Sequence, residues 1–229
     1  MKPILVLLPG LDGSGQLFTP LLTALGDDFD CRVLALPTDG EQTPITLAQR
    51  LLQQLPTQRF VLLAESFSGA IAAEIATMQP ANLAGLILVA TFLQTPRPWL
   101  LQMPKPVVWL GWRLHRPLVA LWWPFCGYRS DVSTRDRVLA SLRILPWSTL
   151  WQRLQAIRTL PARPFNILCP AISIHAQADR LIPASARAQL DCVASSRSMR
   201  GPHFLLQSEP VAAATLIRDW FDITFPETG

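Results

Sequence analysis

Short apolar runs alternate with segments of helical periodicity along most of this chain. The runs are ILVLL (4–8), CRVLAL (31–36), FVLLA (60–64), LAGLILVA (83–90), AISIHA (171–176) and a weaker one near SSRSM (195–199). Runs that are apolar at every position are typical of strands buried on both faces. Strands separated by helices need crossover connections, which join parallel neighbours. The pattern predicts an α/β fold with a mostly parallel, doubly wound sheet.

Helices are expected between these runs, where apolar residues recur every three or four positions. The expected segments are QLFTPLLTAL (16–25), TLAQRLLQQL (46–55), a helix from Phe67, a helix from about Pro183 and VAAATLIRDWF (211–221). Each would cover one face of the sheet.

Residues 92–160 interrupt this alternation. The segment has no convincing strand, several prolines and seven of the eight tryptophans of the chain. Such a segment would struggle to close a core of its own. It is therefore expected to be a helical insertion, and residues 1–91 and 161–229 are expected to form one α/β core.

Composition excludes several classes of protein. The chain has 229 residues, 50% of them hydrophobic, which is enough for a sizeable core and argues against disorder. The net charge is only +4, with no lysine run and no zinc-finger spacing, so no nucleic-acid partner is expected. The four scattered cysteines, Cys31, Cys126, Cys169 and Cys192, are typical of buried free thiols in a reducing compartment.

The N-terminal MKPILVLLPG begins with a lysine and an apolar run, as secretory signals do. The run is too short, lacks a small-residue cleavage site and leads into a glycine-rich turn, so we interpret it as the first strand. No stretch reaches the roughly 18 apolar residues of a membrane span. The expected location is the cytoplasm.

The stretch LLAESFSGA (62–70) is the first candidate for chemistry. Ser66 follows a predicted buried strand and precedes a predicted helix, at the sheet edge where α/β proteins bind ligands. A nucleophile on such a tight turn needs small residues two before and two after it, here Ala64 and Ser68. Ser68 is the less favoured nucleophile, because the strand would then end too early. Glu65 is expected to be a structural or solvent-facing neighbour.

A serine hydroxyl needs a base to take its proton and an acid to orient that base. Of the three histidines, His115 lies in the insertion, where packing is expected, and His175 lies inside an apolar run, where a core position is expected. His203, in the loop GPHF, is the candidate base. Asp179, in ADRLIP, is the candidate acid, although alone it would more often be a capping or turn residue.

The order Ser, Asp, His and its contexts resemble the α/β-hydrolase superfamily over nearly the whole chain. The motifs are LLPGLDGSG after the first strand, AESFSG, ADRLIP and GPHF. LPGLDGSG in particular is similar to the hydrolase part of phytyl-ester-synthase-type proteins and to small bacterial carboxylesterases. The resemblance implies that residues 92–160 form a helical lid. It also implies an oxyanion hole, made by the backbone N–H groups of Leu11 and Phe67.

No cofactor or metal is expected. The glycines of GLDGSG (10–15) do not have the G-x-G-x-x-G spacing of a dinucleotide site, and no ribose-binding acid follows at a clear strand end. Asp12 within this loop is expected to be a turn residue.

Charge is distributed unevenly between the insertion and the rest of the chain. Residues 92–160 contain ten basic and two acidic residues, a net +8, so the remainder carries 4 − 8 = −4. Aromatic bulk with cationic edges is typical of a surface that meets amphiphiles, which suggests an anionic carrier protein or a membrane surface as partner. The alternative is that the tryptophans are insertion core and the arginines its solvated face. The tryptophans expected to contact substrate are Trp109, Trp112, Trp122 and Trp123.

Together these features predict a serine hydrolase that cleaves hydrophobic acyl esters through an acyl-enzyme. Two other enzymatic functions remain open: an acyltransferase, and a thioesterase or esterase for carrier-bound acyl groups. A non-catalytic acyl-binding protein of the same fold is the alternative from another class.

Overall fold

The computed structural model describes residues 2–98, 102–114, 123 and 132–226. Six strands form one sheet in the order β2-β1-β3-β4-β5-β6, and all neighbouring strands are parallel. The strands are β1 (Ile4–Leu8), β2 (Asp30–Val33), β3 (Phe60–Glu65), β4 (Leu83–Val89), β5 (Ala171–Ala176) and β6 (Ser195–Met199). The predicted α/β fold with a mostly parallel sheet is confirmed.

Strand position explains strand composition. Every residue of β1 and β3 is buried, because helices cover both faces of the central strands. β6 is an edge strand and is exposed at four of its five positions, which suits its polar sequence SSRSM. β2 ends earlier than the predicted run 31–36, because the chain leaves β1 and the Leu36 N–H binds the Gly13 carbonyl at 2.8 Å.

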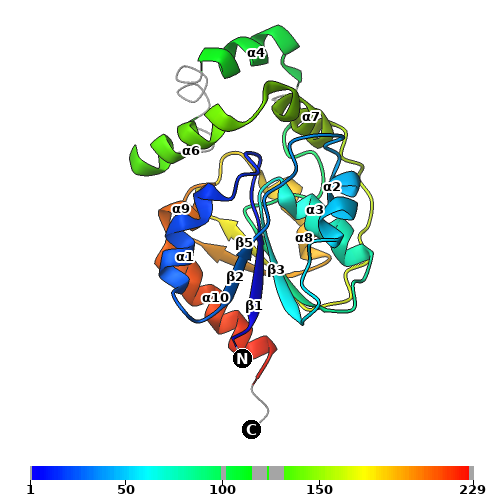
Figure 1. The fold of residues 1–229 in the computed structure, drawn as a ribbon, viewed down its shortest axis with the longest axis vertical. Helices are drawn as coiled ribbons and strands as arrows, with labels where there is room; N and C mark the ends of the chain where they lie inside the picture. Colours follow the sequence, from blue (N-terminus) through cyan, green and yellow to red (C-terminus); the bar gives the residue numbers. More distant parts are fainter. Residues whose placement is uncertain (1, 99–101, 115–122, 124–131, 227–229) are drawn as a thin grey trace.

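Helices form a layer on each face of the sheet (Figure 1). One layer packs against the face that carries Val61 and Leu63, and the other against the face that carries Leu62 and Ala64. The first layer contains α1 (Thr19–Leu25), α9 (Leu205–Ser208) and α10 (Pro210–Thr224), preceded by the short helix η1 (Gln16–Phe18); the second contains α2 (Pro44–Leu52), α3 (Ser68–Thr77) and α8 (Ala184–Asp191). Strand residues alternate between the two cores because successive side chains point to opposite faces.

In its described residues, the segment between β4 and β5 forms helices and loops and contains no strand. Its helices are α4 (Lys105–Leu114), α6 (Val132–Ile144) and α7 (Trp147–Arg158), and they lie beyond the carboxyl ends of the strands (Figure 1). Phe92 and Leu93 at its start, and Ala156 and Ile157 near its end, are buried in the core on the α3 side of the sheet. The segment is therefore anchored in the α/β core at both ends.

None of the helices in the described ranges is both long enough and apolar enough to cross a bilayer.

The described cysteines are free thiols, and they differ in exposure. Cys31 and Cys169 are half-buried, and burial, assisted by Asp30, raises the pKa of Cys31 to about 11. Cys192 is exposed, so the expectation of a buried thiol is wrong there. Cys126 lies outside the described residues.

Strand order locates the ligand-binding edge. The chain moves from β1 outward to β2 and then returns to the other side of β1 for β3, so the connections diverge between β1 and β3. Ligands of open α/β sheets bind at this point, outside the carboxyl ends of the strands. The loops that follow β1 and β3 meet here: a Cβ built on Gly10 would lie 3.6 Å from the Ser66 Cβ.

Candidate active site

Ser66 occupies a strained turn between β3 and α3. Its φ angle is +51°, in the left-handed region that costs a non-glycine residue roughly 1 kcal/mol or more. Three hydrogen bonds hold the turn: the Ser66 N–H donates to the Val89 carbonyl at 3.0 Å, and the Ser66 carbonyl accepts from the Gly69 N–H and the Thr91 hydroxyl. These bonds keep the turn in its strained conformation, which places the Ser66 side chain at the edge of the sheet.

Small residues around Ser66 allow close approach of neighbouring backbone. Ala64 and Ser68 are fully buried, and the Ser68 hydroxyl donates to the Pro9 carbonyl, which joins the turn to the loop after β1. Gly69 was missed by the sequence reasoning. A Cβ at this position would lie 1.8 Å from Thr91 Oγ1, so no larger residue fits without movement. The signal was present in AESFSG, whose glycine comes three positions after Ser66 instead of two.

The three residues singled out by sequence lie together. Ser66 Oγ is 3.0 Å from His203 Nε2, and His203 Nδ1 is 2.9 Å from Asp179 Oδ2. The His203 and Asp179 side chains are only 5% and 1% exposed, so water does not compete for this pair. The second Asp179 oxygen accepts the backbone N–H groups of Leu181 and Ile182 at 2.8 and 2.9 Å, which fixes the carboxylate.

Burial and charge act in opposite directions on this pair. Burial by itself would lower the pKa of His203, but the charge and hydrogen bond of Asp179, together with Glu65, raise it above the ordinary histidine value. Burial would raise the pKa of Asp179, but His203 and the two backbone N–H groups lower it. Asp179 therefore stays ionised and favours the imidazolium form of His203.

His175 is not one of the hydrogen-bonded residues of this site. His175 is buried in β5, as expected, with Nε2 3.4 Å from Ser173 Oγ. Burial lowers its pKa, and so does the charge of Arg187. His115 lies outside the described residues.

A cavity of about 280 Å³ opens at Ser66 and His203. Leu11 and Phe67, the expected oxyanion-hole residues, both line it, and Phe67 caps the N-terminus of α3. Most of the remaining wall is hydrophobic and comes from the core and from the segment between β4 and β5, with Leu17, Phe92, Val138, Leu150 and Ile182 among its members.

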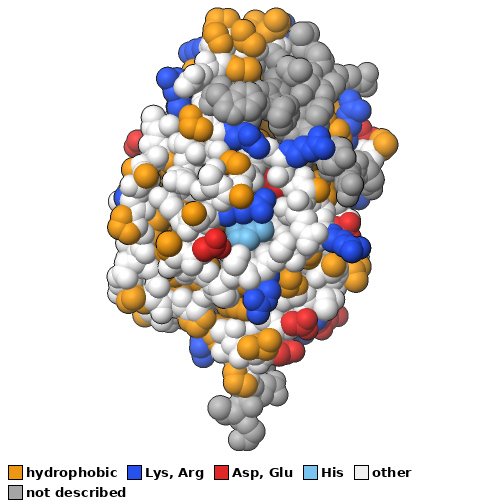
Figure 2. Space-filling view, turned by 180° about the vertical axis from the view of Figure 1, so that it is seen from behind, with side chains coloured by type: hydrophobic (Ala, Val, Ile, Leu, Met, Phe, Trp, Pro, Cys, Tyr) orange, Lys and Arg blue, Asp and Glu red, His pale blue; other side chains and the backbone are white. Residues whose placement is uncertain are grey.

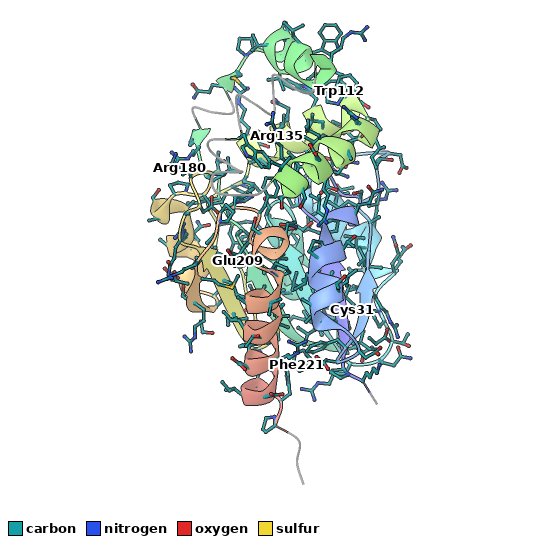
Figure 3. The ribbon with its side chains drawn as sticks, turned by 90° about the vertical axis from the view of Figure 1, so that its left-hand side faces the viewer. Cys31, Trp112, Arg135, Arg180, Glu209 and Phe221 are labelled. Atoms are coloured by element: carbon teal, nitrogen blue, oxygen red, sulfur yellow. The ribbon has the colours of Figure 1, made fainter. Side chains whose placement is uncertain are left out.

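The four tryptophans expected at the substrate have different positions. Trp112 and Trp123 line the cavity, and Trp112 packs against Trp147 of α7 at 5.7 Å between ring centroids. Figure 3 labels Trp112 near the top of the molecule, where α4 lies. Trp109 does not line the cavity: it is 42% exposed on the outer side of α4. Trp122 lies outside the described residues.

Arg153 of α7 connects the helical segment to the loops of the core. It is fully buried and donates to the Leu11 carbonyl at 2.8 Å, the Pro37 carbonyl at 3.0 Å and Gln42 Oε1 at 3.0 Å. Burial lowers the pKa of Arg153 to about 10, an effect that Asp12 partly offsets. Asp12 itself accepts the backbone N–H of Ser14, so it is the expected turn residue.

Glu65 is not solvent-facing. It is 4% exposed and lines the same cavity as Ser66, and Gln207 of α9 donates to its carboxylate at 3.0 Å.

Within the described ranges, no group of three or more His, Cys, Asp or Glu side chains is arranged to hold a metal ion.

Three features are typical of α/β hydrolases: the parallel sheet, the strained serine at its carboxyl edge, and the helices inserted between β4 and β5 above that edge. A family model described as "Serine aminopeptidase, S33" matches residues 44–200, which include Ser66 and Asp179. The chain belongs to this family of α/β hydrolases. A sequence search among curated proteins gives no match.

Solved structures share the fold over nearly the whole chain. A hydrolase from Pseudomonas aeruginosa PA01 has a TM-score of 0.79 and 18% identity, covering 96% of this chain and 90% of the other. The enol-lactonase from Burkholderia xenovorans LB400 has a TM-score of 0.76 and 17% identity, covering 96% and 92%. A thermophilic esterase from Thermogutta terrifontis has a TM-score of 0.76 and 18% identity, covering 98% and 90%. At these identities the similarity establishes the fold.

Proposed function

We propose that this hydrolase is a serine carboxylic-ester hydrolase that acts on hydrophobic acyl esters without a cofactor. The observation that carries the proposal is the chain of hydrogen bonds from Ser66 through His203 to Asp179, at 3.0 and 2.9 Å, which begins in an apolar cavity. This geometry is what a serine nucleophile, its base and an orienting acid require.

The mechanism follows from the positions of these groups. Ser66 Oγ attacks the ester carbonyl while His203 Nε2 takes its proton, and the ionised Asp179 stabilises the imidazolium that forms. The backbone N–H groups of Leu11 and Phe67 donate to the oxyanion of the tetrahedral intermediate. His203 then protonates the departing alcohol, and a water molecule activated by the same imidazole resolves the acyl-enzyme.

The cavity supports an acyl group of limited size. Its volume of about 280 Å³ lies near the lower end of the range of small-molecule sites, about 300–1,000 Å³. Helices α4 and α6 act as a lid in this proposal, because their residues Val108, Trp112 and Val138 line the cavity that opens at Ser66 and would exclude water from the acyl group. An apolar wall favours an acyl chain and offers little to a charged one.

A series of p-nitrophenyl esters of increasing acyl length tests this function. We expect kcat/KM to rise with each methylene, by up to a few-fold per step, until the chain fills the cavity, because each buried CH₂ contributes about 0.8 kcal/mol. Aminoacyl p-nitroanilides serve as the comparison, since the family model is described as a serine aminopeptidase. Preference for the anilides would replace the ester proposal with a peptidase.

The alternatives need separate measurements. A fluorophosphonate probe should label Ser66, whereas a non-catalytic acyl-binding protein would stay unlabelled. Product analysis with an added alcohol separates hydrolysis from acyl transfer, because a transferase forms the new ester in place of the free acid. A carrier-bound thioester cleaved faster than any oxygen ester would favour the thioesterase alternative.

We further propose that the outer side of α4 meets an anionic lipid surface. Val107, Trp109 and Leu110 are 53%, 42% and 51% exposed there, and Lys105 and Arg113 lie on the same helix. Figure 2 shows hydrophobic side chains at the top of the molecule, where Figure 1 places α4, with Lys and Arg side chains below and beside them. Exposed apolar residues with a basic border are typical of interfacial helices. A carrier protein would need the charge but not the apolar residues.

Lys105→Gln/Arg113→Gln should weaken action on esters held in vesicles of phosphatidylcholine with phosphatidylglycerol. We expect about a 30-fold loss in association, because each of the two basic residues contributes about 1 kcal/mol near an anionic surface and about 1.4 kcal/mol corresponds to a factor of ten. Raising salt from 0.1 M to 1 M should weaken the wild type similarly, since the Debye length falls from about 10 Å to about 3 Å. A water-soluble short ester should be unaffected.

The matched control is Lys2→Gln/Arg59→Gln, which removes the same charge where the exposed Lys2 and Arg59 precede β1 and β3, at the opposite end of the sheet. It should leave the vesicle rate unchanged. Equal losses in both double variants would mean that only total charge matters. Salt sensitivity with an acidic carrier-bound substrate, but none with vesicles, would assign the surface to a carrier protein instead.

A further inference from the structure

Glu65 is the last residue of β3 and occupies a buried position where an apolar residue is expected. Val61 and Leu63 precede it on the same side of β3 and are buried in the core on the α1 side of the sheet. Alternation places the Glu65 side chain on that same face, and it is only 4% exposed. A carboxylate at the end of a buried apolar row is an exception that the fold alone does not require.

The groups that face Glu65 come from three other segments. Gln207 Nε2 of α9 donates to both carboxylate oxygens, at 3.0 and 3.3 Å. His203, in the loop before α9, attracts the carboxylate, whereas Asp12, in the loop after β1, repels it. His203 is hydrogen-bonded to Ser66 and Asp179, and it lines the same cavity as Glu65. The charges of both Asp179 and Glu65 raise the pKa of His203.

Stability does not explain this carboxylate. Burial raises the pKa of Glu65 from 4.5 to about 7, against the opposing effects of Gln207 and His203. The folded protein therefore holds this proton to higher pH than the unfolded chain does, and stability falls as pH rises from about 4.5 to about 7. Leucine at this position would continue the apolar row without that cost.

We propose that Glu65 is a positioning residue of the reaction, which acts through His203 as a second negative charge beside the imidazolium while its bond to Gln207 holds the His203 loop against the Ser66 turn. This inference rests on the proposed serine-hydrolase function. The Glu65–Gln207 bond joins the residue before Ser66 to the helix that follows His203. The two segments that must keep the 3.0 Å contact between serine and histidine are thereby fixed to each other.

Glu65→Gln is the informative variant, because it keeps the size and a hydrogen-bonding partner for Gln207 but removes the charge. The pKa of His203 is measured by NMR titration of its ring proton, which is identified among the three histidines by its loss in His203→Ala. We expect this pKa to fall by about one unit, and kcat at the pH plateau to fall about tenfold with little change in KM.

The pH profile should change in shape as well as position. Protonating either His203 or Glu65 makes the other harder to protonate, so the acid limb of kcat/KM in the wild type should extend over two coupled ionisations. In Glu65→Gln the limb should follow a single ionisation at lower pH. Above pH 7 this variant should unfold at the same temperature as the wild type or a higher one, because a costly buried charge is gone.

Glu74→Gln is the matched control. Glu74 is also a buried glutamate, on α3, but it pairs with Arg163 and has no contact with His203. Its pH profile should match the wild type.

An unchanged His203 pKa in Glu65→Gln would overturn the proposal, as would a loss of kcat that merely follows a loss of stability. If the wild type failed to hydrolyse any ester, the proposed function would fall, but the NMR titration would still decide whether Glu65 acts on His203.

Discussion

Ser66→Ala and His203→Ala should each reduce ester hydrolysis by about 10⁴-fold or more, because members of one proton-transfer unit fail together. Ser66 supplies the nucleophilic oxygen, and His203 Nε2, 3.0 Å away, is its base. Both side chains lie at the wall of the cavity, so their truncation should leave the two cores intact. The measurement is kcat/KM on the best p-nitrophenyl ester, with circular dichroism and thermal unfolding to establish the fold.

Ser68→Ala is the control for this pair. Ser68 is fully buried, and its hydroxyl donates to the Pro9 carbonyl instead of facing the cavity. Losing that bond should loosen the loop that carries Leu11 and lower kcat partially, without abolishing turnover. If Ser68→Ala were inactive and Ser66→Ala active, the nucleophile would have to be reassigned to Ser68.

Arg153→Met should lower the free energy of unfolding by about 3 kcal/mol, because three buried acceptors lose their donor and each costs roughly 1–3 kcal/mol before water compensates. The acceptors are the Leu11 and Pro37 carbonyls and the Gln42 side chain. For a chain of this size the melting temperature should fall by about 10 °C. Methionine fills most of the volume, so the loss reports hydrogen bonding more than packing. Urea unfolding and thermal melting measure both quantities.

The same substitution should slow catalysis. Arg153 holds the carbonyl of Leu11, the residue whose N–H is proposed to bind the oxyanion, so the loop after β1 loses an anchor. Arg158→Met on the same helix is the matched control: Arg158 is exposed, and its substitution should change the unfolding free energy by less than about 0.5 kcal/mol. If both variants behaved alike, the stabilising role of Arg153 would be refuted.

The sequence predicted the fold because the relevant signals are local. Continuous apolar runs such as those of β1 and β3 can be buried only where helices cover both faces of a sheet, and crossovers make such a sheet parallel. Even the polar edge strand β6 was found from its position in the alternation of strands and helices. The prediction of where β2 ends was less accurate, because a hydrogen bond from the Leu36 N–H to the Gly13 carbonyl takes the chain away from the sheet.

The candidate residues Ser66, Asp179 and His203 were also chosen from sequence, because each follows a strand and the carboxyl ends of parallel strands share one edge. Their distances of 3.0 and 2.9 Å, however, depend on how the loops fold. The exposure of α4 shows the same limit. The spacing of its tryptophans did not reveal that Trp112 lines the cavity while Trp109 faces outward, because the periodicity of an isolated helix gives two sides without saying which one meets the core.

Only the tertiary structure decided the roles of Arg153, Gln207 and Glu65. Arg153 meets Gln42 across 111 positions of sequence, and Gln207 meets Glu65 across 142. A charged residue in a helix or at a strand end ordinarily remains solvated. Nothing in the neighbouring sequence distinguishes Arg153 and Glu65 from such solvated residues. They are buried because α7 covers the loops at the carboxyl edge of the sheet and α9 packs beside α1 and α10, which removes water from these side chains and supplies their hydrogen-bond partners from distant segments of the chain. That exchange of water for protein partners exists only in the folded state.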